Sequence, residues 1–371
     1  CPRVLTQGAI MALACQPLLL VIAWGMGELF STMGHPPEQV VLERQYYFVM
    51  MSGAFFALLK ACVAGYFCGI GKTRVVMITD VLGVLINIPL TWALIFGKLG
   101  FPELGIRGAA LATVIATACS LLIYAAFYFN RIHRERFHVA DSFRFDPGIL
   151  RRYVRLGLHP GFETFVGAAT FNFFLLLFQS YGIAEGAAMA IVFNWDMLNY
   201  VPLIGLNIAI TSMIGRYVGA RDMTRAGQLI AAGFTIALGF SVVLALFFVL
   251  FRYELMMVFA TPGEDFSEIA SLGASMMLGM ATYVVADAVI LVCSGVLRGA
   301  GDTRWLMNTS MSLHVLMLVA QYVMIKHLEV GPLVSWWGFV AMLLALAVVY
   351  LLRLRGSTWR KPSRLARVMA D

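Results

Sequence analysis

Four ionisable side chains lie deep within long apolar stretches of this chain, namely Lys60, Glu163, Asp196 and Asp287. A fifth, Glu28, stands nearer the end of its stretch, where it can reach water. An ionisable group inside a membrane-spanning helix is costly, and such groups mark ion paths, substrate sites or compensating ion pairs. Each of these residues is therefore a candidate for function.

Asp287 is the strongest candidate because of the residues that share its helical face. Tyr283 precedes it by one turn and Ser294 follows it by two turns. Hard cations prefer oxygen ligands, and this stripe offers a carboxylate, a phenol and a hydroxyl. The stripe predicts a cation site, and the alternative is a buried aspartate that pairs with a neighbouring helix for packing.

Asp196 begins a second polar stripe, which continues through Asn199, Tyr200 and Asn207 at spacings of three, four and eleven residues. A polar stripe that faces lipid would be costly, so this one must face a cavity or another helix. We expect it to line a substrate cavity. Hydrogen bonding between helices is the alternative.

Glu163 and Lys60 each allow two interpretations. Glu163 follows His159-Pro160 early in its apolar stretch, where an acid could meet a coupling ion or a cationic substrate. The other interpretation is that Glu163 lies near a helix start, where the helix dipole stabilises its carboxylate. Lys60 is expected to line the cavity of the first lobe and repel cations, or else to neutralise a carboxylate of a neighbouring helix.

The composition places these residues in a membrane. Of the 371 residues, 61% are apolar and only 13% are charged, and the mean hydropathy is +0.84. Soluble domains carry about 25% charged residues, which excludes a soluble enzyme, a secreted disulfide scaffold and a disordered regulator. The six cysteines show no C-x-x-C spacing, so we expect no disulfide and no structural metal.

Ten apolar stretches are long enough to cross a bilayer as helices, which takes roughly 20 residues. They do not alternate in polarity as the strands of a membrane barrel would. The predicted fold class is therefore an all-α polytopic membrane protein. We place the spans near residues 8–30, 46–68, 76–96, 106–129, 154–180, 186–210, 229–250, 271–296, 306–326 and 332–352.

Basic residues predict the topology. When connections are assigned alternately to two sides, 21 of the 27 Lys and Arg fall on one side, which predicts that both chain ends are cytoplasmic in the cell membrane. The longest basic connection separates four spans from six, and beside a span it favours the lipid surface over nucleic acid. We expect an N-terminal lobe at 1–130, a cytoplasmic linker at 131–153, a C-terminal six-helix lobe at 154–352 and a basic cytoplasmic tail at 353–371.

An internal repeat relates the two lobes. The segment Gly69 to Arg74 (GIGKTR) is echoed 230 residues later by Gly299 to Arg304 (GAGDTR), each after a long apolar span. The two copies have the same orientation in the membrane, which predicts a parallel repeat. By this offset, the partner of the fifth span would begin before Cys1, and no initiator methionine is present. We expect ten of twelve transmembrane helices in this chain, the first two being absent.

Three glycine-rich segments carry a family resemblance. They are Pro202-x-x-Gly205-x-x-x-Ala209 to Gly215-x-x-x-Gly219-Ala220, Ser294-Gly295-x-x-Arg298-Gly299-x-Gly301-Asp302-Thr303, and Gly97-x-x-Gly100-x-Pro102-x-Leu104-Gly105-x-x-Gly108-Ala109-Ala110. With these segments, the chain resembles the multidrug and toxic compound extrusion (MATE) family of secondary antiporters, whose related flippases share the architecture. The turn of the first lobe departs from the family pattern, because Cys68 stands where an arginine is usual.

The resemblance implies export of amphipathic or cationic small molecules in exchange for sodium or protons, by alternating access of two lobes. Tyr283 and Asp287 stand at positions similar to the cation-binding tyrosine and aspartate of sodium-coupled members, and the helix of Glu163 often carries a functional glutamate. We expect cation coupling at Asp287, Tyr283 and Glu163, with sodium possible at the first two. No cofactor besides the coupling ion is expected, and the protein is expected to be a monomer.

Two other functions remain as alternatives. A flippase for lipid-linked oligosaccharides would share the two-lobe fold, and an intramembrane enzyme would need paired catalytic groups. The chain has no H-E-x-x-H, no Walker A and no G-x-S-x-G motif, so neither common enzyme chemistry nor direct use of ATP is expected. The sequence leaves open the substrate and the choice between sodium and protons.

Overall fold

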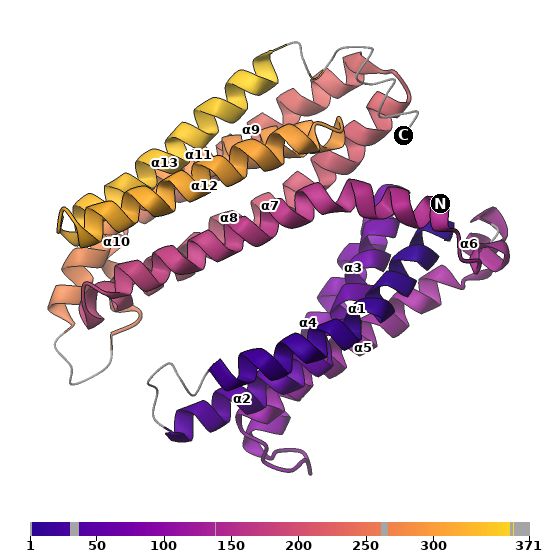
Figure 1. Cartoon of the computed structure of the whole chain (residues 1–371), viewed down its shortest axis with the longest axis horizontal. Coiled ribbons are helices and arrows are strands. Elements are labelled where there is room, and N and C mark those ends of the chain that lie inside the picture. Colours follow the sequence, from indigo (N-terminus) through magenta and orange to yellow (C-terminus); the bar gives the residue numbers. More distant parts are fainter. Residues whose placement is uncertain (1, 30–36, 138, 261–265, 357–358, 360–371) are drawn as a thin grey trace. The chain divides into compact units, whose positions relative to one another are not determined.

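The computed structural model describes residues 2–29, 37–137, 139–260, 266–356 and 359, and all regular structure in these residues is helical (Figure 1). Nine of the described helices are long and apolar enough to cross a membrane, or ten if one bent pair forms a single span. The predicted all-helical polytopic membrane fold is therefore confirmed. The chain divides into two compact units, Cys1–Arg155 and Leu156–Asp371, whereas the predicted lobe boundaries stay a prediction.

Unit 1 holds five long helices and a short connection. Helices α4 and α5 pack against each other, α5 also packs against α2 and α3, and α1 packs against α2 and α3. The elements are α1 (Pro2–Leu29), α2 (Pro37–Ser52), α3 (Ala54–Gly69), α4 (Thr73–Phe96), α5 (Ile106–Tyr128), α6 (Arg131–Phe137) and the short 3-10 helix η2 (Val139–Ser142).

The stretch predicted as one span at 46–68 is broken at Gly53. The segments Val40–Ser52 and Ala54–Gly69 meet there at 44°. A Cβ atom on Gly53 would overlap the side chain of Val114 in α5, so only glycine lets the bend lie this close to its neighbour. Periodicity alone carries no signal for such a bend.

Helix α7 begins earlier than predicted, at Pro147 and not near 154, so it takes up part of the expected linker. The Asp146 carboxylate accepts hydrogen bonds from the backbone N–H groups of Gly148 and Ile149, at 2.9 and 3.1 Å. Asp146 thus caps a helix whose first residue is proline, a favoured combination at a helix start. The predicted basic tail lies mostly outside the described residues, and α13 continues to Arg355.

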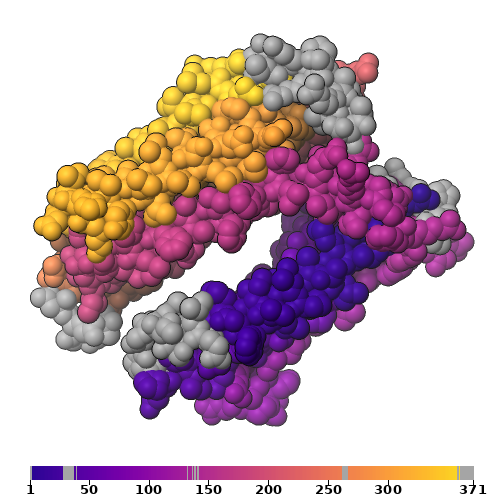
Figure 2. Space-filling view, in the orientation of Figure 1, coloured from indigo at the N-terminus to yellow at the C-terminus, as the bar shows by residue number. Residues whose placement is uncertain are grey.

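Unit 2 is built around helix α11. In the apolar window of α11, 72% of the residues are buried, against at most 33% in the other candidate spans. It packs against α8, α9 and α13, and Figure 2 shows α12 and α13 side by side on the visible face of this unit. The helices are α7 (Pro147–Gln179), which belongs to this unit from Leu156 onward, α8 (Ile183–Gly219), α9 (Met223–Leu250), α10 (Arg252–Met257), α11 (Ser267–Gly299), α12 (Thr303–Lys326) and α13 (Pro332–Arg355).

The repeated glycine turns have the same geometry in both units. Gly71 and Gly301 take positive φ values of 77° and 81°, a conformation that glycine adopts without strain. The N–H groups of Lys72 and Asp302 then donate to the carbonyls of Phe67 and Leu297, each at 2.8 Å. The repeat found in the sequence is therefore also a repeat of backbone structure.

His133 anchors the short helix α6 to unit 1. Its side chain is buried between Tyr66, whose hydroxyl lies 3.0 Å from Nε2, and Lys72, whose Nζ lies 3.2 Å from Nδ1. The rings of Tyr128 and Phe137 pack beside it. A protonated Lys72 can only donate, so Nδ1 is the acceptor, and Nε2–H donates to the Tyr66 hydroxyl.

We predict that acidification loosens this anchor. Burial, together with the charge of Lys72, lowers the pKa of His133 below its usual 6.5. When α6 detaches, His133 is exposed to water and takes up a proton below about pH 6.5, whereas the buried ring stays neutral at that pH. The contribution of His133 to holding α6 in place is therefore full above that pH and is lost as the pH falls. Hydrogen exchange of the α6 amides, corrected for intrinsic rates, should increase between about pH 7 and 5.5. In His133→Phe the corrected rates should not change over this interval, and a wild-type response there would contradict the prediction.

Candidate functional site

Helices α8 and α11 bring Asp196, Tyr283 and Asp287 together in the interior of unit 2. Their exposed fractions are 6%, 1% and 8%. Tyr283 and Asp287 lie four residues apart on α11, and so share the face turned toward Asp196 of α8. Asp196 is close enough to both to interact with them electrostatically. The structure thus adds Asp196 to the pair that the helical spacing had placed together.

The Tyr283 hydroxyl and the Asp196 carboxylate face each other and interact. Neither the hydroxyl nor Oδ1 of Asp196 has a partner of good hydrogen-bond geometry among the described residues. Buried polar atoms normally have such partners. Of two neighbouring carboxylates that are shielded from water, one takes up a proton unless a metal cation balances the two charges. The arrangement is therefore suited to bind a small cation or a proton.

The stripe that follows Asp196 divides into two kinds of residue. Asn199 and Asn207 are buried and make hydrogen bonds to other helices, which was the alternative to cavity lining. Tyr200 is 38% exposed and lies near Asp196 and Asp287. Of the three side chains, that of Tyr200 is the exposed one. The predicted lining of a substrate cavity by Asn199, Tyr200 and Asn207 stays a prediction.

Ser294, which the sequence placed on the predicted cation-binding stripe, bonds to other groups in the described structure. Its hydroxyl accepts a hydrogen bond from Nδ2 of Asn207 at 2.9 Å and donates to the Leu291 carbonyl at 3.2 Å. It thus contributes to the packing of α8 against α11. The oxygens that remain for a cation come from the two aspartates and the tyrosine.

Glu163 lies apart from the two aspartates. Nη2 of Arg298 is 3.2 Å from both of its carboxylate oxygens, so that α7 is joined to α11 by an ion pair. Arg298 follows Asp287 by eleven residues, or about 16 Å along a helix. Glu163 is therefore paired with an arginine at a different level of α11 from Asp287. Its predicted role in cation coupling stays a prediction.

Removing Arg298 should cost stability through Glu163. The Glu163 and Arg298 side chains are 11% and 29% exposed, so Arg298→Ala leaves a largely buried carboxylate without its counter-ion. We expect a loss of about 2 kcal/mol, since a partly exposed pair is worth less than a fully buried one. Thermal unfolding in detergent should show a lower Tm for Arg298→Ala than for the double variant with Glu163→Gln. Equal values would contradict this account.

Lys60 forms an ion pair with Asp80 in unit 1. Its Nζ lies 2.9 Å from Oδ1 of Asp80, which joins α3 to α4. Both side chains are partly exposed, by 30% and 48%. Lys60 thus neutralises a carboxylate of a neighbouring helix, which was one of its two interpretations. Its predicted contact with substrate stays a prediction.

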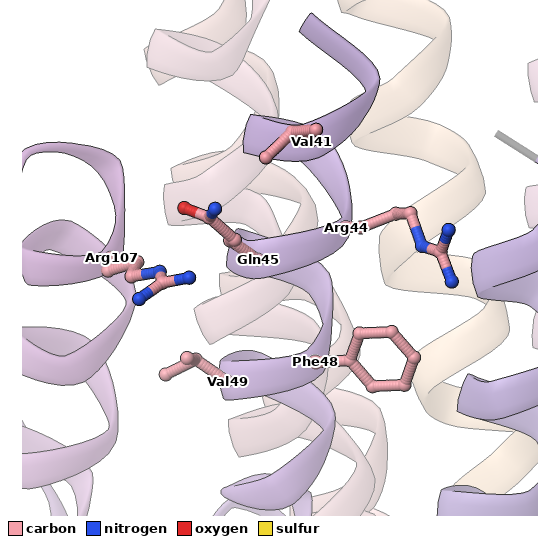
Figure 3. A pocket seen from close by; sticks show the side chains of 6 residues that line it. All are labelled: Val41, Arg44, Gln45, Phe48, Val49 and Arg107. Atoms are coloured by element: carbon pink, nitrogen blue, oxygen red, sulfur yellow. The ribbon is translucent and has the colours of Figure 1, made fainter. Parts of the chain in front are cut away.

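A hollow of about 510 Å³ lies at α2 and the start of α5 in unit 1. Arg107 points toward Gln45, while Arg44 and Phe48 point to the other side of α2 (Figure 3). None of the predicted site residues lines this hollow, and its two guanidinium groups would repel a cation. The acids of unit 2 remain the better candidate site.

Three residues important to these arrangements had no clear signal in the sequence. Ser241 is a single serine in an apolar stretch, Asp80 lies near the start of its apolar stretch, and Arg298 stands in a glycine-rich segment that gives no sign of its partner. Their partners are 20 to 135 residues away. Within the described residues, no group of three or more His, Cys, Asp or Glu could hold a metal ion.

The chain was compared with proteins of known sequence and structure. It is 29% identical over 327 residues to a probable multidrug resistance protein NorM from Thermotoga maritima, which covers 87% of this chain and 69% of the relative. A MOP superfamily transporter from Pyrococcus furiosus superimposes with a TM-score of 0.86 at 23% identity, over 97% of this chain and 80% of that one. A MATE protein in complex with MaL6 gives a TM-score of 0.84 at 22% identity, over 100% and 80%.

These structural similarities agree in fold with the all-helical architecture described above. The Pyrococcus furiosus protein is described as a transporter, and the Thermotoga maritima protein as a probable multidrug resistance protein. The sequence profile of the MatE family matches residues 2–93 and 161–323, which is more than half of the chain and includes Asp196, Tyr283 and Asp287. The chain therefore belongs to the MatE family of membrane transporters.

Proposed function

We propose that this protein is an antiporter that exports amphipathic or cationic small molecules in exchange for sodium or protons. The observation that carries the proposal is the buried group formed by Asp196 of α8 with Tyr283 and Asp287 of the central helix α11. Two of its oxygens lack a partner of good hydrogen-bond geometry among the described residues. The coupling cation binds there. Tyr200, next to both acids, is the residue we assign to substrate contact.

The chemistry of the acids provides the exchange. Without a cation, two buried carboxylates repel each other, and binding of sodium or a proton relieves this repulsion. A cation that binds one conformation more tightly shifts the transporter toward it. A cationic substrate competes for the same negative charge, so that entry of the coupling ion displaces it.

The relatives support the substrate class. The Thermotoga maritima protein is described as a probable multidrug resistance protein, and an acidic interior suits organic cations. A flippase for lipid-linked oligosaccharides is not favoured, because two aspartates would repel its anionic diphosphate. We also infer that both chain ends face the cytoplasm and that the protein acts as a monomer, the first from the basic residues of alternate connections.

Transport in everted membrane vesicles tests this function. The full-length protein is expressed, a fluorescent organic cation is supplied, and either a sodium or a proton gradient is imposed. We expect one of the gradients to drive accumulation of the dye in vesicles with the protein and not in vesicles without it. If neither gradient moves any of several organic cations, the proposal is wrong.

A further inference from the structure

A chain of buried hydrogen bonds runs from α9 through α8 to α11, beside the cation site. Ser241 of α9 donates from Oγ to Oδ1 of Asn199 at 2.7 Å. Asn199 in turn donates from Nδ2 to the Val284 carbonyl of α11 at 3.4 Å. Ser241 and Asn199 are both fully buried, so these bonds do not compete with water.

The direction of the Ser241 hydroxyl is unusual for this protein. Most described Ser and Thr hydroxyls in its helices donate to a carbonyl of their own helix, as Ser275 does to Ser271 and Thr235 to Ala231. That bond satisfies a hydroxyl locally. Ser241 gives up this local bond for a different helix, and so its position links α9 to α8.

The link lies at the level of the cation site. Val284 directly follows Tyr283 and precedes Asp287 by three residues, and Asn199 follows Asp196 by three residues. The same turn of α8 therefore carries an acid of the site and the amide that holds α11. Any sliding of α11 along α8 would stretch the Asn199 bond and change the spacing of Asp196 from Asp287.

A second link holds the two helices further along. Nδ2 of Asn207 donates to the Leu291 carbonyl at 2.6 Å and to Ser294 Oγ at 2.9 Å. Asn207 follows Asn199 by eight residues, and Leu291 follows Val284 by seven, so α8 and α11 run in parallel and in register. Two links on one side of α11 restrict both its sliding and its rotation.

We propose that Ser241 and Asn199 are positioning residues that set the geometry of the cation site at Asp196, Tyr283 and Asp287. The inference rests on the proposed function. Without Ser241, the side-chain amide of Asn199 would be free to rotate. The Ser241 hydroxyl fixes its orientation by donating to Oδ1, so that Nδ2 points to α11. The affinity for the coupling cation therefore depends on a serine of α9 that is not itself a ligand.

Ser241→Ala tests the proposal through the cation affinity. Loss of one buried hydrogen bond is worth about 1 kcal/mol, so the half-saturating concentration of the coupling cation should rise about 5-fold. The maximal transport rate should change less than twofold, and Ser241→Thr, which keeps a hydroxyl, should restore most of the affinity. Asn199→Leu removes both bonds and should raise the half-saturating concentration further.

Two matched controls lie on the same helices as the site. Asn194 of α8 is exposed and Ser275 of α11 is half-buried, and among the described residues each bonds to a carbonyl of its own helix. Asn194→Ala and Ser275→Ala should leave the cation dependence as in the wild type. A variant that changes stability alone would lower the amount of protein or its Tm without moving the half-saturating concentration.

A second readout does not depend on transport. The Tm of the purified full-length protein is followed as sodium chloride replaces choline chloride, and in parallel as the pH is varied. The midpoint of this stabilisation should shift in Ser241→Ala as the half-saturating concentration does. If Ser241→Ala fails to fold, the nearly isosteric Ser241→Cys replaces it, with a shift in the same direction.

The outcomes separate this inference from the proposed function. If Asp287→Asn loses the response to cations while Ser241→Ala keeps wild-type midpoints, the inference is wrong and the proposed function stands. If Asp287→Asn responds to sodium and pH like the wild type, the site itself is wrong. A uniform fall in rate with an unchanged midpoint in Ser241→Ala also overturns the inference, because it indicates only a structural role.

Discussion

Replacing Asp287 by Asn is expected to abolish ion-driven export. Asn keeps the shape of the side chain but removes the charge that balances a cation beside Asp196 and Tyr283. Supporting residues around an ion site are worth up to about 100-fold in affinity, and the loss of a central carboxylate should cost at least as much. The measurement is dye movement in everted vesicles under the driving gradient, at equal amounts of inserted protein.

Glu254→Gln is the matched control for this change. Glu254 is an exposed carboxylate of α10 in the same unit, and its loss should leave transport within twofold of the wild type. Membrane insertion of Asp287→Asn should be normal, since a buried carboxylate is costly in any case. Full export by Asp287→Asn would show that coupling takes place elsewhere.

Gly108→Ala is expected to destabilise unit 1 strongly. A Cβ atom on Gly108 in α5 would overlap the Leu94 carbonyl oxygen of α4 and lie 2.6 Å from its carbonyl carbon. Backbone atoms cannot turn aside as a flexible side chain can, so α4 and α5 must separate. We expect a loss of about 3 kcal/mol, seen as a fall of about 5 °C or more in the Tm of the purified protein.

Gly65→Ala provides the comparison for that prediction. Gly65 lies in α3 of the same unit, and a Cβ atom there meets nothing within 4 Å. Alanine is favoured over glycine inside a helix by about 0.5–1 kcal/mol, so the Tm should stay the same or rise slightly. Similar losses in the two variants would mean that the α4–α5 contact is not what makes Gly108 necessary.

The sequence determined the elements and the family. Ten apolar stretches predicted helices that the structure contains, because a segment in lipid must satisfy its own backbone hydrogen bonds. The repeated turn was also readable, since Gly71 and Gly301 take a positive φ that other residues adopt only with strain. The bend at Gly53 was missed because it depends on Val114, 61 residues away in the chain.

The sequence also placed Tyr283 and Asp287 on one face, because four residues make about one helical turn. The same rule placed Asn199 and Asn207 on one stripe with Asp196, but it could not tell a cavity from a neighbouring helix. Both amides are in fact bonded to α11.

Periodicity along one helix therefore indicates which side chains share a face, and by itself determined the fold class and the candidate acids. Which groups meet across helices was decided only by the tertiary structure. Asp196 beside Asp287, Glu163 with Arg298 and Ser241 with Asn199 join residues 42 to 135 positions apart. Such pairs depend on the rotation and register of packed helices, which no local pattern contains.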